Sequence, residues 1–191
     1  SGTILAFAAT NTSNAPVVGT VVVTPTYTNA GLTCSGATQD VLITVNPTPT
    51  ADPVANQTVC VGSPTAAVNF SSTFNVAGTS YAWTNSNTAI NLGANGTSNI
   101  AAFTTTNTVN TPISGTVSVT PSMTNSGVTC SGSPQSFSIT VNPIPTVVNP
   151  ADQVVCNNAP TSALNFSGTV TGTAFNWTNT NTSINLGATG N

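Results

Sequence analysis

The sequence contains no lysine, no arginine and no histidine, and its only acidic side chains are Asp40, Asp52 and Asp152. Proteins that bind nucleic acid neutralise phosphates with lysine and arginine, so a nucleic-acid-binding surface is excluded. The same absence removes the attraction to anionic membranes and the lysine of phosphate-binding loops. Without histidine, neither a Ser-His-Asp nor a Cys-His arrangement can form, and most general acid–base groups are missing. We therefore expect a protein that is not an enzyme.

The sequence also offers few side chains that could bind metal ions or cofactors. Calcium usually requires several clustered carboxylates, whereas the three aspartates are scattered over 191 residues. Zinc is disfavoured because the four cysteines lack both CxxC spacing and histidine. A weak calcium site between units stays as an alternative, because Asp52 and Asp152 lie in proline-rich linkers. No apolar stretch approaches the ~20 residues of a membrane span. We expect no metal, no cofactor and no membrane insertion.

The sequence contains runs in which Val, Ile, Thr and Phe alternate with other residues, and hydrophobic residues account for 38% of the chain. Disordered chains are usually poor in β-branched and aromatic residues, so these runs predict a packed all-β fold rather than disorder. No helical period of 3.6 residues is evident. The expected strands are 56–60, 65–72, 80–84, 98–106, 114–124 and 135–143.

The chain repeats itself with a period of about 96 residues. Cys34 recurs as Cys130, Cys60 as Cys156 and Phe7 as Phe103, each 96 positions later, and "ITVNP" at 43–47 recurs at 139–143. The tryptophans recur at 94 positions, because a loop after residue 70 is two residues longer in the first copy. Internal repetition of this length indicates a tandem array.

The repeat divides the chain at the proline-rich stretches that follow each "VNP". Residues 1–47 are then the C-terminal half of one repeat, residues 48–143 a complete repeat, and residues 144–191 the N-terminal half of the next. We interpret the chain as a window of a longer repetitive polypeptide. The alternative is a natural subunit whose half-domains complete one another between chains by strand exchange.

About seven short strands in one period match the size of an immunoglobulin-like β-sandwich. Its buried strand-C tryptophan would correspond to Trp83. The residues expected in the core are Trp83, Trp177, Phe70, Phe103, Phe137 and Phe166. As an alternative, the two tryptophans form a platform that stacks on sugar rings, because Asn and Thr follow each of them.

Four sequence features together carry a family resemblance. They are the "NQTVC" or "DQVVC" start, the aromatic-x-Trp-Thr strand, the "NLGA" turn and the "ITVNP" end. With these features the whole chain resembles the PKD-like, immunoglobulin-like repeats of very large surface proteins in Bacteroidota. It departs from the better-known PKD pattern, because "TNSNT" and "TNTNT" replace the acidic turn after Trp. The resemblance implies extracellular stalk or adhesin repeats at the cell surface, often exported by the type IX system.

Each period contains one pair of cysteines. Cys60 and Cys130 are the candidate disulfide within the complete repeat, which an oxidising exterior would favour. Cys34 and Cys156 would then pair with cysteines outside the chain. The alternative is free thiols, because Cys60 and Cys130 could lie at opposite poles of the domain, too far apart to bridge.

These observations predict a non-catalytic structural segment of a long extracellular filament, stalk or surface adhesin. Its partners would be neighbouring repeats or identical chains, whose nearly uncharged surfaces repel one another little. We expect fibres that are insensitive to salt. The alternative function is a carbohydrate-binding or adhesive module that recognises surface glycans through exposed Trp, Asn and Thr side chains.

Overall fold

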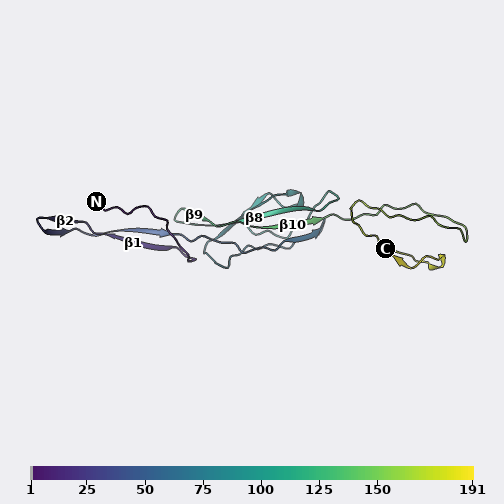
Figure 1. Cartoon of the computed structure of the whole chain (residues 1–191), viewed down its shortest axis with the longest axis horizontal. Coiled ribbons are helices and arrows are strands. Elements are labelled where there is room, and N and C mark those ends of the chain that lie inside the picture. The colour runs from purple at the N-terminus through teal and green to yellow at the C-terminus, as the bar shows by residue number, and fades with distance from the viewer. Residues whose placement is uncertain (1) are drawn as a thin grey trace.

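A computed structural model describes residues 2–191 as an elongated all-β chain (Figure 1). The strands form several sheets, an arrangement consistent with a β-sandwich. In chain order the elements are β1 (Val17–Val23), β2 (Thr26–Asn29), β3 (Leu32–Ser35), β4 (Gln39–Val45), β5 (Gln57–Cys60), β6 (Ser80–Asn85), the 3-10 turn η1 (Thr88–Ile90), β7 (Asn95–Gly96), β8 (Ile113–Asn125), β9 (Val128–Ser131), β10 (Gln135–Asn142), β11 (Trp177–Thr178), the 3-10 turn η2 (Thr182–Ile184) and β12 (Thr189–Gly190).

Three parts follow one another along the long axis of the molecule (Figure 1). We call residues 2–47 the N-terminal segment, residues 48–143 the central unit and residues 144–191 the C-terminal segment. β1 to β4 lie at one end of the picture, β8 to β10 in the middle, and the C-terminus toward the other end. Every residue of the buried hydrophobic cluster lies between Ala51 and Val141, so within residues 2–191 only the central unit has a core of its own.

The central unit is built on a six-stranded sheet with the order β5-β10-β8-β6-β7, in which β9 extends the sheet by pairing with β8. β5 runs parallel to β10, whereas β6 and β10 are antiparallel to β8. The alternation expected along β8 and β10 is confirmed, because Val117, Val119, Ile139 and Val141 are completely buried and Phe137 almost so. One face of these strands therefore forms one wall of the core.

The opposite wall consists of two extended segments, 63–70 and 100–105. Val68 and Ile100 exchange two backbone hydrogen bonds of 2.8 and 2.9 Å. The predicted strands 65–72 and 98–106 are therefore present only as isolated bridges, at Val68–Ile100 and Pro64–Thr104. Backbone hydrogen bonds join the segments at Thr65, whose N–H donates to the Phe103 carbonyl at 3.0 Å, but the Phe103 N–H donates to the Thr65 hydroxyl at 3.2 Å instead of returning a backbone bond, so the ladder is interrupted there.

The N-terminal segment consists of two antiparallel ladders, β1 with β4 and β2 with β3. Its local structure repeats that of the central unit. The turn between β2 and β3 has positive φ at Ala30 (48°) and Gly31 (81°), as the turn between β8 and β9 has at Ser126 (50°) and Gly127 (79°). Two successive positive φ angles are typical of the type I′ turn, whose twist suits a two-residue hairpin.

The junction between the N-terminal segment and the central unit is packed. Pro47 and Pro49 are fully buried there. The Asn125 side-chain amide donates to Oδ1 of Asn46 at 2.8 Å, and the Asn46 amide donates to the backbone carbonyl of Asn125 at 3.4 Å. A buried proline pair and reciprocal amide bonds restrict bending between the two parts.

Candidate functional site

The motif that occurs twice, "WTNSNTAINLGANG" (83–96) and "WTNTNTSINLGATG" (177–190), forms the same corner in both copies. Trp83 lies on β6 opposite Gly96 of β7, and its indole Nε1 donates to the carbonyl of Ser98 at 2.9 Å. A Cβ added to Gly96 would lie 2.5 Å from Cζ2 of Trp83, so the ring lies directly on the glycine backbone. Only 8% of Trp83 is exposed, and a ring covered in this way cannot stack on a sugar.

The asparagines of the motif organise its turn. The Asn85 side-chain amide donates to the carbonyls of Asn87 and Leu92 at 2.9 and 3.0 Å, and its Oδ1 accepts from the Asn87 backbone N–H at 3.1 Å. Asn87 caps η1 by accepting from the Ala89 N–H, and Asn91 ends it in the left-handed conformation at φ 73°. Short polar side chains of this kind are favoured at caps and turns. These asparagines are therefore structural in the first copy.

The same bonds recur in the C-terminal segment, where the Asn179 amide donates to the carbonyls of Asn181 and Leu186 at 3.1 and 3.0 Å. Asn181 caps η2 as Asn87 caps η1. The local fold of the motif thus forms without a complete core around it. What differs between the two copies is the surroundings of its apolar side chains.

Those apolar side chains are uncovered in the C-terminal segment. Ile90 is 0% exposed, whereas its counterpart Ile184 is 66% exposed. Leu164 and Leu186 are likewise about half exposed, although their counterparts in the central unit are buried. Trp177 and Phe166 are half-buried, so the prediction that they belong to a core is wrong for this structure, because the strands that would cover them are not present beside them.

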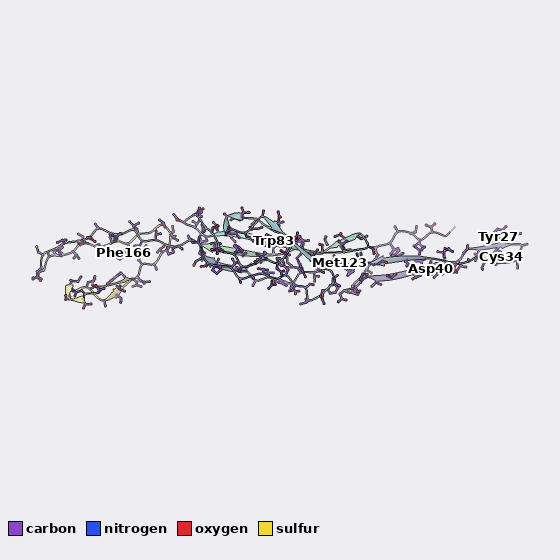
Figure 2. The ribbon with its side chains drawn as sticks, turned by 180° about the vertical axis from the view of Figure 1, so that it is seen from behind. Tyr27, Cys34, Asp40, Trp83, Met123 and Phe166 are labelled. Carbon is purple, nitrogen blue, oxygen red and sulfur yellow. The ribbon has the colours of Figure 1, made fainter. Side chains whose placement is uncertain are left out.

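An open hollow of about 410 Å³ adjoins Phe166 and Trp177. It is lined by the proline-rich stretch that begins at Pro145 and by Phe166, Phe175 and Trp177. The Phe166 and Phe175 rings stack with centroids 6.1 Å apart. Figure 2 shows Phe166 in this end part of the chain, away from Trp83 in the middle. The lining is mainly proline and aromatic residues, with the polar residues Thr146, Asn149, Thr173 and Asn176 among them, and it carries no charged group.

The N-terminal segment exposes apolar side chains whose counterparts in the central unit, on β8 and β10, form the other wall of the core. Val23 and Val41 are 49% and 52% exposed, whereas their counterparts 96 positions later, Val119 and Phe137, are 0% and 3% exposed. Val21, Ile43 and Val45 of the same face are half-buried. A contiguous apolar face of this kind marks an interaction surface on a soluble protein.

The other aromatic predictions hold for the central unit. Trp83, Phe70 and Phe137 are buried in the cluster, and Phe103 is partly buried and packs against it. The Phe70 and Tyr81 rings lie 5.8 Å apart. Burial raises the pKa of the Tyr81 hydroxyl above its usual value, and the charge of Asp52 adds to this effect.

The predicted disulfide between Cys60 and Cys130 is wrong, because all four cysteines are free. Cys60 follows Val59, which lies level with Ile113 through their shared neighbour Val141, whereas Cys130 pairs with Met123. Ile113 and Met123 are ten residues apart on β8, or about 33 Å at ~3.3 Å per residue. A disulfide needs Cα atoms within about 7 Å. The two thiols therefore lie at opposite ends of the central unit.

Asp52 secures the linker to the central unit. Its carboxylate accepts from the Thr73 backbone N–H at 2.8 Å, from the Thr73 hydroxyl at 3.1 Å and from the Ser71 hydroxyl at 2.9 Å. The Thr73 N–H bond is the main cause of a lowered pKa at Asp52. Within residues 2–191 no cluster of three or more metal-ligating side chains is present. In the same residues no helix has the length and apolar character to cross a membrane.

At three glycines that the sequence interpretation overlooked, another segment approaches the backbone closely. Gly96, Gly115 and Gly132 lie where an added Cβ would collide with a neighbouring side chain or backbone. Their counterparts in the other repeats are also glycine, at positions 190, 19 and 36. A glycine kept at the same repeat position on a strand signals close approach of another segment, and this signal was available in the sequence.

Comparison with protein-family models and with curated protein sequences finds no match for this chain.

Proposed function

We propose that this chain is a non-catalytic structural segment of a long extracellular filament, stalk or surface adhesin. Its units would be tandem immunoglobulin-like sandwiches of the PKD-like kind that the sequence resembles. The observation that carries the proposal is the linear arrangement of similar β units along one axis, joined through a packed proline junction (Figure 1). Such an arrangement sets length and spacing, as a stalk requires.

The chemistry of the surface supports this role. Lys, Arg and His are absent, so no side-chain ion pair contributes to cohesion. The described contacts between the N-terminal segment and the central unit are amide hydrogen bonds and buried prolines. Interactions of these kinds are little affected by ionic screening, whereas contacts between charges weaken with salt.

The carbohydrate-binding alternative receives no support from the first tryptophan, because Trp83 is covered by Gly96 and bonded to Ser98. Trp177 is more open, but its ring lies on the backbone of Gly190, and the adjoining hollow is lined mainly by proline and aromatic residues with Asn and Thr among them. Glycan recognition needs both an exposed ring and nearby hydrogen-bonding side chains. We therefore favour the structural role.

The test is small-angle scattering and negative-stain electron microscopy of the chain at increasing NaCl. Raising the salt from about 0.01 M to about 1 M shortens the screening length from about 30 Å to about 3 Å. We expect an elongated particle at every salt concentration, and we expect any fibres that it forms to persist throughout. A compact particle, or fibres that dissociate on addition of NaCl alone, would contradict the proposal.

A further inference from the structure

The two ends of the chain expose opposite walls of the same kind of core. The N-terminal segment corresponds to the second half of the central unit, because β1 and β4 match the positions of β8 and β10 at an offset of 96. The C-terminal segment corresponds to the first half, which supplies η1 and the Trp83 corner. Within the central unit these two halves enclose one buried cluster.

We propose that the C-terminal segment of one copy of this chain docks on the N-terminal segment of a second copy and completes a sandwich like the central unit. The inference rests on the proposed structural role and names a partner for it. The central unit is the template, because it shows the same two sequence halves already packed together. An interface that resembles a domain core cut in half is typical of obligate association.

The template defines the register between the two copies. In the central unit β10 pairs in parallel with β5, with Ile139 opposite Gln57. By the offset of the repeat, Ile43 of one copy would lie opposite Gln153 of the other.

The second pairing comes from β8 and β6, which are antiparallel with Val119 opposite Trp83. The equivalent pair is Val23 of one copy and Trp177 of the other. This pairing would place Val23 over the aromatic side chains that border the open hollow. Both exposed edges would then gain the strand partners that an unpaired edge lacks.

A glycine provides an independent indication of what covers β1. A Cβ added to Gly115 of β8 would lie 2.6 Å from Oδ1 of Asn85 and 2.7 Å from Cδ1 of Ile90, because the Trp83 corner lies directly on this glycine. At the equivalent Gly19 of β1, the nearest atom to an added Cβ is the Ile43 carbonyl oxygen at 3.9 Å. Within residues 2–191 no neighbour requires glycine at position 19. A docked second copy would require it, because its Asn179 and Ile184 would lie there.

The N-terminal segment already has the local structure that docking needs. The Asn11 amide donates to the carbonyls of Ala15 and Val45 at 2.8 Å each, as the Asn107 amide donates to those of Thr111 and Val141 at 2.9 Å each. Together with the η2 bonds described above, this means that both surfaces are largely preorganised. Preorganisation reduces the entropic cost of association.

The arrangement of the parts makes the association open-ended. The two complementary faces lie at opposite ends of an elongated chain (Figure 1), so each copy uses one face for each neighbour. A heterologous contact of this kind generates a linear chain unless the rotation closes a ring. The molecule would therefore extend head to tail, with one complete sandwich formed at every contact.

The test uses the full chain with one variant for each face. Gly19→Val blocks the N-terminal face, and Thr20→Val, whose counterpart Thr116 is exposed in the central unit, is its control. Ile184→Asp blocks the C-terminal face, and Thr182→Asp, whose counterpart Thr88 is exposed, is its control. Sedimentation velocity at about 10 μM protein measures assembly, since a core-like interface should give a Kd well below that concentration.

We expect the unchanged chain and both controls to form polymers. Each blocking variant alone should remain a monomer, with affinity lowered at least about 100-fold. A mixture of Gly19→Val and Ile184→Asp should form a 1:1 dimer and nothing larger, because each supplies the one face that the other has lost. Unfolding of the central unit, followed by Trp83 fluorescence, should be the same in all variants.

Several results would overturn the inference. They are a monomeric unchanged chain, polymers of either blocking variant, loss of assembly in either control, and a mixture that fails to dimerise. The proposed structural role would survive each of them if the particle remained elongated and indifferent to salt. Conversely, a compact or salt-labile particle whose blocking variants still formed the 1:1 dimer would contradict the structural role and leave the docking inference intact.

Discussion

Replacing Ile90 by alanine should destabilise the central unit strongly. Ile90 lies in η1, is 0% exposed and belongs to the buried cluster. The change removes three carbons beyond Cβ, each worth about 0.8 kcal/mol of transfer free energy, and leaves a cavity that adds to the cost. We expect the free energy of unfolding to fall by about 3 kcal/mol, within the range observed for such truncations.

The assay is urea unfolding followed by tryptophan fluorescence. Trp177→Phe leaves Trp83 as the only indole. Gly19→Val is included because we expect it to prevent assembly. With a slope of about 1.5 kcal/mol per M urea, the midpoint should fall by about 2 M.

The matched control is Ile184→Ala, the same change at the equivalent position of the C-terminal segment. Because Ile184 is 66% exposed and lies outside the central unit, the unfolding reported by Trp83 should change by less than about 0.5 kcal/mol. Equal effects of the two substitutions, or no effect of Ile90→Ala, would refute the reasoning that burial distinguishes the two copies.

Three further predictions concern the central unit and the two tryptophans. Gly96→Ala should lower the free energy of unfolding by at least about 2 kcal/mol, because the new Cβ would lie 2.5 Å from Trp83 Cζ2. Gly93→Ala should leave it nearly unchanged, since the nearest neighbour of an added Cβ there is 3.9 Å away. Chemical denaturation of both variants checks this prediction. Asp52→Asn should lower the melting temperature at neutral pH. The folded pKa of Asp52 lies below its unfolded value, so the stabilisation is present above the unfolded pKa of about 3.9 and is lost as the pH falls through the folded pKa. If the variant still melted at a lower temperature than the unchanged chain at strongly acidic pH, the hydrogen bonds of the carboxylate would not be the source of the effect. In the unassembled chain, acrylamide should quench Trp177 much more than Trp83, and strong quenching in the Trp177→Phe variant would reopen the sugar-platform interpretation.

Much of the fold of the central unit was predictable from the sequence. The alternation of Val117 and Val119 on one strand, and of Phe137 and Ile139 on another, identifies the buried face because side chains on a strand point alternately to its two sides. The strands 56–60 and 80–84 were found within one residue of the observed β5 and β6. The segment around Val68 was overestimated, because its few bridges depend on a partner distant in the sequence.

The candidate surfaces were less predictable. The sequence assigned Trp177 and Phe166 to a core by analogy with Trp83 and Phe70, because burial was inferred from residue type and repeat position. Burial depends on which segments are adjacent in space, and the two copies of the motif differ in their neighbours. The glycines at 19 and 115 carried the missing information, since glycine at one strand position in two repeats implies an approaching neighbour.

The amino-acid sequence by itself determined the period, the all-β character, the apolar faces of the strands and the absence of cationic side chains, because these depend on composition and on spacing along the chain. Only the tertiary structure decided that Trp83 lies on Gly96, that Cys60 and Cys130 are at opposite ends of the central unit, and that the apolar faces at both ends are uncovered. Those facts depend on the register between strands and on contacts between residues far apart in the sequence, and neither follows from local pattern alone.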